Sequence, residues 1–406
     1  MGCVAVDDLR QGMVLSEDVR DIHSRLLLSR GQTINEKHLR ILKIWGVCTV
    51  NVVGASKEAI DAPDWNDPGR LADARQTVDA LFKFVNADHK ALRIVYEASV
   101  AQRCKDGAAR PAAGGFAVGE GIETDIDVAA IRRRIADRRL KLPDAPTIIS
   151  ELNGVIADPF ATSNDVARVV HKSPTLAALL LRIVNSAYYG FPSRIDRITR
   201  AVTIIGTKEI SNLALGICVM RAFKDIPADI IDMHAFIRHS LACGLIARMI
   251  AAQINLAETE QVSVAGLLHD IGKLVLYKYY PAAMAVARGH ATATDGSVYQ
   301  SEKALLGMNH TQLAQQLLQH WQIPAVLTNT ITCHHKPSTA RDVTKAAIVQ
   351  MADLIANGLG FGTSGERAIP VFDETAWGKL NVPAPNVNLV IRQALHQMRA
   401  LDIAIV

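Results

Sequence analysis

The spacing of apolar side chains divides this chain into two unequal parts. Residues 1–55 contain short β-branched or Leu-rich runs between turn residues, and one run, residues 35–46, with helical spacing after an Asn that can cap it. We therefore expect a small α+β module at the N-terminus. From residue 126 onwards, apolar residues recur at helical intervals in successive segments bounded by Ser, Asn, Pro and Gly. This pattern predicts a large all-α domain, so the fold class is expected to be mainly α.

The residues between these parts have a different character. Residues 56–104 are polar, with apolar residues near helical spacing, and predict a helical connector. Residues 105–125 are rich in Gly, Ala and Pro and show no period, which predicts a flexible linker and the best domain boundary. The helical domain is therefore expected at residues 126–406, with its core at about 126–360.

Composition narrows the classes of function. The net charge is +4, and the single basic run, residues 131–141, is interpreted as a solvated helix face, so binding of nucleic acid is not expected. The six cysteines form no CxxC pair, which is typical of reduced thiols in a cytoplasmic protein. We find no signal-peptide pattern and no apolar run near the roughly 20 residues of a membrane helix. A cytoplasmic protein without a membrane segment is expected.

Polar residues interrupt the apolar stripes of the helical domain at five places. Burying an unpaired imidazole or carboxylate is costly, so each of these positions needs a partner. Each belongs to a different predicted helix or helix end, as do the ligands of a metal centre inside a helical bundle. Imidazole and carboxylate without thiolate suit Fe, Mn, Zn or similar divalent ions. The candidate metal ligands are His239, His269, Asp270, His310, His334, His335 and Asp353.

The segment GLLHDIGKL, residues 266–274, adds a positive charge to this set. On a helix, Lys273 shares a face with His269 and Asp270, where its ammonium group can contact a phosphate that a metal also polarises. Cys333, next to His334, is interpreted as a small buried apolar residue rather than a thiol ligand. A single histidine is more often a satisfied core or surface residue than a ligand. That interpretation is kept for His171, His234, His290, His320 and His396.

These motifs resemble a known group of proteins. The sequence LLHDIGK, with one His upstream and His, His-His and Asp downstream, resembles the HD superfamily of metal-dependent phosphohydrolases. The preceding segments NSAYYG and AVTIIGTKEI resemble the HDOD domain of bacterial signalling proteins, over about residues 126–360. Residues 4–53 resemble the small domain that often precedes HD-GYP cyclic-di-GMP phosphodiesterases. The resemblance therefore implies a bacterial signal-transduction protein.

The resemblance also implies roles for the candidate residues. His239 takes the place of the first histidine, His269 and Asp270 form the HD pair, and the other four complete a set of ligands for two metal ions. Asp270 would bridge the ions and Lys273 would contact phosphate, which makes these two the candidate catalytic residues. Two features differ from HD-GYP enzymes: the Gly-Tyr-Pro loop is missing, and Ala235 stands where some of them supply a glutamate for a third metal. A trinuclear site is therefore not expected.

Three functions remain open at this point. The intact ligand set favours a metal-dependent phosphohydrolase acting on a phosphate ester. Many HDOD domains have lost catalytic ligands, so a non-catalytic regulatory or scaffolding module that acts through protein contacts is the alternative. A sensor that binds a cyclic dinucleotide without cleaving it is the third. Signalling proteins are the expected partners in each case, and a homodimer is compatible with all three.

Overall fold

The computed structural model describes most of the helical part of the chain and much of the N-terminal module. The predicted linker lies outside the described residues, apart from its first two positions, which end a helix. Most of the basic run at residues 131–141 also lies outside them. The described residues are 2–6, 9–20, 26–44, 47, 49–53, 68–86, 88–106, 132–133, 142–185, 189, 191 and 193–405.

The N-terminal module is built from short strands and one helix, as its pattern predicts. Strands β1 (Gly2–Ala5) and β4 (Thr49–Val52) pair antiparallel, and β2 (Val19–Arg20) pairs with β3 (Leu26–Leu28). Helix α1 (Glu36–Ile44) lies between β3 and β4 in the chain. The apolar side chains of this module form a small core separate from that of the helical body. The expected α+β character is confirmed.

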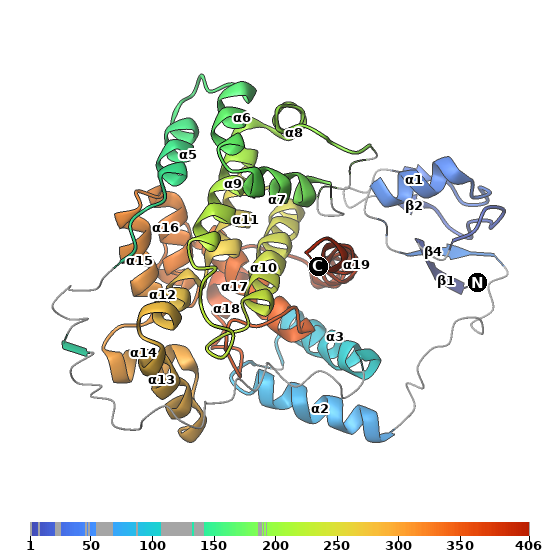
Figure 1. The fold of residues 1–406 in the computed structure, drawn as a ribbon. Helices are drawn as coiled ribbons and strands as arrows, with labels where there is room; N and C mark the ends of the chain where they lie inside the picture. Colours follow the sequence, from blue (N-terminus) through green and yellow to red (C-terminus); the bar gives the residue numbers. More distant parts are fainter. Residues whose placement is uncertain are drawn as a thin grey trace.

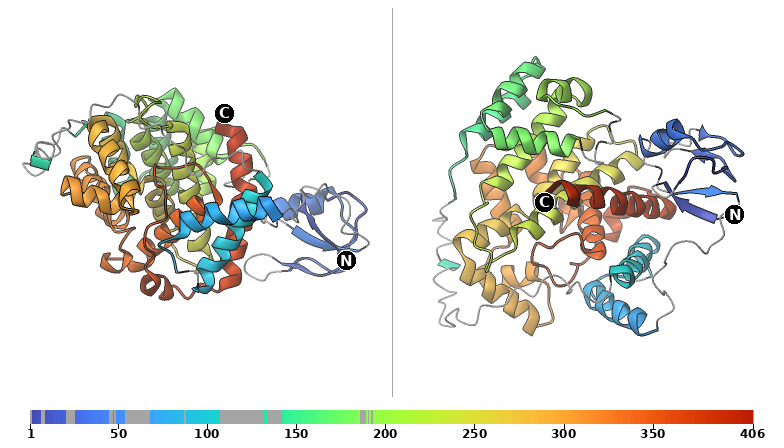
Figure 2. Two further views of the ribbon diagram at one scale, coloured as in Figure 1. Left: turned by 90° about the horizontal axis from the view of Figure 1, so that it is seen from below. Right: turned by 45° about the vertical axis from the view of Figure 1, so that its right-hand side comes forward.

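The rest of the described chain is helical (Figure 1). In both views of Figure 2, the N-terminal module protrudes from the side of the helical body where the C-terminal helix lies. The prediction of a mainly α fold is therefore confirmed. The helices are α2 (Pro68–Phe82), α3 (Lys90–Asp106), α5 (Thr147–Ala157), α6 (Ser163–His171), α7 (Pro174–Val184), α8 (Ile198–Ile205), α9 (Thr207–Arg221), α10 (Met233–Gln253), α11 (Thr259–Leu268), α12 (Ile271–Tyr279), α13 (Pro281–Ala293), α14 (Val298–Leu306), α15 (His310–His320), α16 (Ala325–Thr332), α17 (Val343–Leu359), α18 (Glu374–Gly378) and α19 (Ala384–Ile405).

Helix α10 lies at the centre of the helical body, where it packs against α11, α17 and α19. The Asp232 side chain caps its first turn by accepting hydrogen bonds from the backbone amides of His234 and Ala235. Within the described residues, α10 is the one helix long and apolar enough to cross a membrane. However, 72% of its most apolar stretch is buried inside the structure. Its apolar composition is therefore explained by its place in the core.

The segment GLLHDIGKL forms a helix break rather than one continuous helix. Helix α11 ends at Leu268 and α12 begins at Ile271, so His269 and Asp270 lie at the junction. The backbone amide of Lys273 donates to the carbonyl of Asp270, which starts the new helix. Helix α12 packs against α15 so closely at Gly272 that a Cβ there would collide with the His310 carbonyl oxygen. The glycine between Asp270 and Lys273 thus permits the approach of the two backbones.

Helices α2 and α3, in the predicted connector, share the core of the helical body. Helix α3 packs against α17 and α19, and its apolar residues belong to the same hydrophobic cluster as those of α10 and α17. The contact with α17 is close, because a Cβ on Gly358 would lie 2.7 Å from Ser99 Oγ. The guanidinium group of Arg103 also donates to the Gly358 carbonyl.

The close approach at Gly272 predicts a large effect of a single methyl group. We expect Gly272→Ala to lower the free energy of unfolding by about 1–3 kcal/mol, because the added Cβ forces the α12 and α15 backbones apart. Gly289→Ala is the matched control: Gly289 also lies in a helix, but nothing surrounds its Cβ position within 4 Å. The control is expected to be neutral or to stabilise by up to about 1 kcal/mol. Urea unfolding measures both, and equal stability of the two variants would contradict the prediction.

Candidate metal centre

The seven predicted ligands come together in the interior of the helical body. They lie on α10, at the α11–α12 junction, at the first residue of α15, after the end of α16, and on α17. All seven are buried, with exposed fractions of 0–9%. The five histidines set aside in the sequence lie outside this cluster, as does Cys333. The side chains fall into two neighbouring groups of four, and one member had not been predicted.

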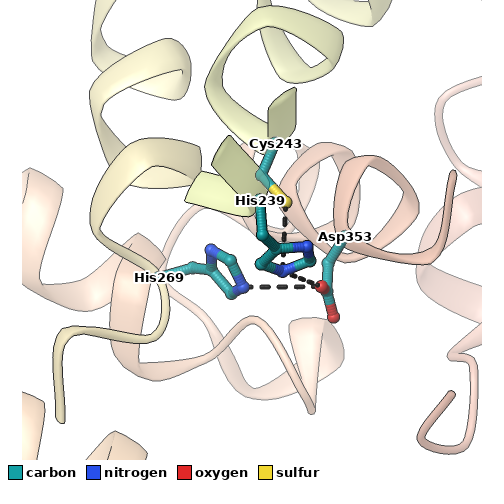
Figure 3. A group of neighbouring side chains, drawn as sticks. All are labelled: His239, Cys243, His269 and Asp353. Carbon is teal, nitrogen blue, oxygen red and sulfur yellow. Dashed lines mark hydrogen bonds and ion pairs between the residues drawn. The ribbon is translucent and has the colours of Figure 1, made fainter. Parts of the chain in front are cut away.

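The first group consists of His239, Cys243, His269 and Asp353 (Figure 3). The ligand atoms of these four side chains all lie within 4.8 Å of one another. Asp353 Oδ1 lies 3.1 Å from His239 Nε2 and 3.4 Å from His269 Nε2. Cys243 Sγ lies 3.5 Å from His239 Nε2, one helical turn further along α10. Two imidazoles, one carboxylate and one thiol therefore face a common point.

The second group consists of Asp270, His310, His334 and His335, whose ligand atoms also lie within 4.8 Å of one another. Asp270 Oδ1 lies 3.2 Å from His310 Nε2 and 3.9 Å from His334 Nε2. Its other oxygen, Oδ2, lies 3.2 Å from His269 Nε2, which belongs to the first group. One carboxylate thus presents an oxygen atom to each group.

Hydrogen bonds on the far side of three imidazoles fix which ring nitrogen faces the centre. His269 Nδ1 lies 2.7 Å from the Gly266 carbonyl, and His334 Nδ1 lies 2.7 Å from the Ile331 carbonyl. His310 Nδ1 lies 2.7 Å from Glu302 Oε2. Because carbonyl and carboxylate oxygens can only accept, each Nδ1 carries the proton. In the neutral rings, each Nε2 is left with its lone pair towards the centre.

Several polar atoms at the centre have no hydrogen-bond partner among the described residues. They include His334 Nε2 and Asp270 Oδ1. In addition, His310 Nε2 and His335 Nε2 lie 3.0 Å apart, and the neutral pair can share only a proton carried by His335. Buried polar atoms without partners are rare in folded proteins. Cations placed between these lone pairs would satisfy them, so the residues present fit a metal centre.

The balance of charge leads to the same conclusion. Four carboxyl groups with exposed fractions of 0–6%, from Asp270, Glu302, Asp353 and Glu366, lie in or beside the two groups. The ammonium group of Lys273, itself 1% exposed, contacts two of them, Asp270 and Glu366. Buried carboxylates need compensating positive charge. Divalent cations would supply it.

The carboxylates also shift the pKa values of the histidines. Burial lowers the pKa of His269, but the Asp270 and Asp353 carboxylates outweigh burial and raise it to about 10. Burial, together with positive charge on His269, lowers the pKa of His334 to about 3, and the pKa of His335 is also held well below its usual value. Without a bound cation, His269 therefore carries a positive charge between the two aspartates.

The ammonium group of Lys273 contacts three buried side chains. Its Nζ atom lies 2.9 Å from Asp270 Oδ2, 3.1 Å from Ser364 Oγ and 3.1 Å from Glu366 Oε1. Ser364 and Glu366 belong to residues 360–366, which follow α17 and are called the covering loop. The contact between Lys273 and Asp270 agrees with their predicted spacing. The two partners in the covering loop were not predicted.

The covering loop is anchored by close backbone contacts. The Thr363 amide donates to the Ala235 carbonyl, and the Tyr277 hydroxyl donates to the Ser364 carbonyl. At Gly362, a Cβ would collide with the Ala235 carbonyl, and its φ of 74° lies in the left-handed region that favours glycine. Ala235, the position where a third-metal ligand was not expected, therefore contacts the covering loop through its backbone.

Sequence reasoning missed Cys243, Glu302 and Glu366. Cys243 is four residues after His239 on a helix, a spacing that places both on one face and that could have identified it. Glu302 and Glu366 lie in segments without a distinctive pattern. Their contacts, to His310 and Lys273, depend on how α14 and the covering loop fold against the centre.

Comparisons with known proteins agree with this architecture. The sequence model of the HDOD domain matches residues 142–337. In the curated proteins, an uncharacterized protein of Treponema pallidum (strain Nichols) is 24% identical over 233 residues. That match covers 57% of this chain and 45% of the relative, so this chain spans less than half of the relative's length.

Solved structures share the fold. An HDOD domain protein of unknown function from Geobacter sulfurreducens has a TM-score of 0.52 at 24% identity, over 66% of this chain and 88% of that one. A candidate phosphohydrolase from Shewanella amazonensis SB2B has a TM-score of 0.52 at 23% identity, over 69% of this chain and all of that one. A candidate signal transduction protein from Marinobacter aquaeolei VT8 has the same TM-score at 22% identity, over 75% and 71% of the two chains. This chain therefore contains an HDOD domain, which spans residues 142–337.

Proposed function

We propose that this chain is a bacterial signal-transduction protein whose helical domain holds two divalent metal ions and has the chemistry of a phosphohydrolase. The observation that carries the proposal is the shared carboxylate of Asp270, which presents one oxygen atom to each group of ligand atoms. One ion would be held by His239, His269 and Asp353, and the second by His310, His334 and His335. Such a pair of ions polarises a phosphate ester and supplies a nucleophile from water near neutral pH.

Asp270 and Lys273 would have different roles in this chemistry. Asp270 would hold both ions at a fixed separation and carry negative charge between them. Lys273, which contacts Asp270 Oδ2, would neutralise a phosphate oxygen of the substrate. The substrate class is therefore a phosphate ester. A cyclic dinucleotide belongs to this class, although the loop that marks HD-GYP enzymes is missing from the sequence.

A second candidate function is favoured by the burial and the existing contacts of Lys273. Its ammonium group is 1% exposed and already contacts Asp270, Ser364 and Glu366. The Glu366 carboxylate thus occupies the position from which a substrate phosphate would approach Lys273. In this closed arrangement the metal centre would act as part of a regulatory or scaffolding module that contacts signalling proteins. Cys104, Cys218, Cys243 and Cys333 are free thiols, which supports a reducing, cytoplasmic location.

The shared role of Asp270 predicts the metal content of the protein. After reconstitution with Mn²⁺ or Fe²⁺ and removal of excess metal, elemental analysis should find about two ions per chain. Asp270→Asn should retain fewer than about one, because both groups lose the charge of their shared carboxylate. Asp295→Asn is the control, since Asp295 is exposed and pairs with Lys83 outside the centre. Two ions retained by Asp270→Asn would contradict the proposal.

The raised pKa of His269 predicts that metal binding is linked to protons. With a pKa of about 10, His269 is protonated at pH 7 in the absence of metal, whereas His334, with a pKa of about 3, is neutral. An imidazole must be neutral to bind a metal, so binding should release at least about one proton from His269. Metal affinity should therefore rise as the pH increases from 7 towards 10.

Calorimetry at pH 7 in buffers of different ionisation enthalpy measures this release. His269→Gln should release about one proton fewer than the wild type, and His290→Gln should match the wild type. An equal release by all three proteins would show that His269 is not a source of the proton.

The contact between Glu366 and Lys273 distinguishes the two candidate functions. With metal bound, we expect Glu366→Gln to hydrolyse p-nitrophenyl phosphodiesters roughly 10- to 100-fold faster than the wild type, because the freed ammonium group can stabilise the phosphate. Glu374→Gln, which alters an exposed glutamate on α18, should leave the rate unchanged. If neither the wild type nor Glu366→Gln turns over this substrate or cyclic-di-GMP, the regulatory function is favoured.

A further inference from the structure

Cys243 differs from the other described cysteines in what surrounds its sulfur atom. Its side chain is 0% exposed, and Sγ lies 3.5 Å from His239 Nε2. It projects from α10 in the same direction as His239, towards Asp353 on α17 and His269 at the end of α11 (Figure 3). Cys218 on α9 belongs to the same hydrophobic cluster as Cys243, but it is a member of neither group of ligand atoms.

A buried cysteine is usually a small apolar residue, so a second observation is required. It comes from His269, whose fully buried Nε2 atom points into the same space, where it lies 3.4 Å from Asp353 Oδ1 and 3.2 Å from Asp270 Oδ2 without a hydrogen bond of good geometry. His269, His239 and Asp353 provide three ligands. The sulfur atom of Cys243 is within 4.8 Å of the ligand atom of each of them. Four ligand atoms of this group thus lie close together, and the shared carboxylate of Asp270 presents an oxygen atom beside them.

We propose that Cys243 is a further protein ligand of the ion held by His239, His269 and Asp353, beside the shared carboxylate of Asp270. This inference rests on the proposed metal centre and specifies the chemistry of one half of it. On metal binding, the thiol would lose its proton to solvent and the thiolate sulfur would be a ligand of the ion. Thiolate is a softer ligand than imidazole or carboxylate. The first group should therefore prefer Zn²⁺, Fe²⁺ or Co²⁺ over Mn²⁺ or Mg²⁺ more strongly than the second group, whose ligands are nitrogen and oxygen atoms alone.

Cobalt substitution tests the sulfur ligand directly. The full-length protein loaded with Co²⁺ should show a thiolate-to-cobalt charge-transfer band in the near ultraviolet, in addition to the visible bands of bound Co²⁺. The ultraviolet band should be lost in Cys243→Ser and Cys243→Ala and retained in Cys218→Ser. Circular dichroism establishes that each variant is folded. In competition titrations, Cys243→Ser should lose on the order of 10- to 100-fold in Zn²⁺ affinity, while its Mn²⁺ affinity stays within about threefold.

The outcomes separate this inference from the proposed function. Visible bands of bound Co²⁺ without the ultraviolet band in the wild type would overturn the role of Cys243 and leave the metal centre standing. An ultraviolet band that persists in the folded Cys243→Ser variant would do the same. Absence of both bands, with no metal found by elemental analysis, would overturn the metal centre itself and this inference with it.

Discussion

The carboxylate of Asp270 is the group on which the rest of the centre depends. It is 2% exposed, and its two oxygen atoms face different sets of imidazoles. Leaving such a charge without partners in a protein interior costs about 3–5 kcal/mol. The junction between α11 and α12, the first residue of α15 and the end of α16 all bring positive or polarisable groups to it. The helical packing around the centre can be understood as the solution to this single electrostatic requirement.

Helix ends provide much of the orientation that the centre needs. The last carbonyl groups of a helix lack partners within the helix. Gly266, near the end of α11, accepts from His269, and Ile331, near the end of α16, accepts from His334. Each histidine thus satisfies a carbonyl group of its own helix end and, in doing so, directs its other nitrogen towards the centre. At each helix end, one hydrogen bond therefore both satisfies a backbone carbonyl and orients a histidine ring.

The sequence allowed the fold class and the seven clustered residues to be predicted, because both leave a local signature. Apolar periodicity marks helices, and His or Asp on an apolar stripe is conspicuous. Cys243 is less conspicuous, since a cysteine is compatible with an apolar face and only its spacing of four residues from His239 relates it to the centre. The junction at His269 and Asp270 was also missed, because apolar residues continue on both sides of it. Glu366 reaches Lys273 from 93 positions away in the chain, and no local pattern encodes that contact. The relation of residues 56–104 to the helical core likewise depends on tertiary packing.

The packing of α3 on α17 has a consequence for the unit that folds. Asp353 lies on α17, and the same helix contacts Ser99 and Arg103 of α3 through Gly358. Helix α3, which precedes the glycine-rich stretch, is therefore packed into the domain that holds Asp353 and does not merely connect the N-terminal module to it. A fragment that begins after that stretch would lack these contacts and would expose the apolar faces of α17 and α19 that α3 covers.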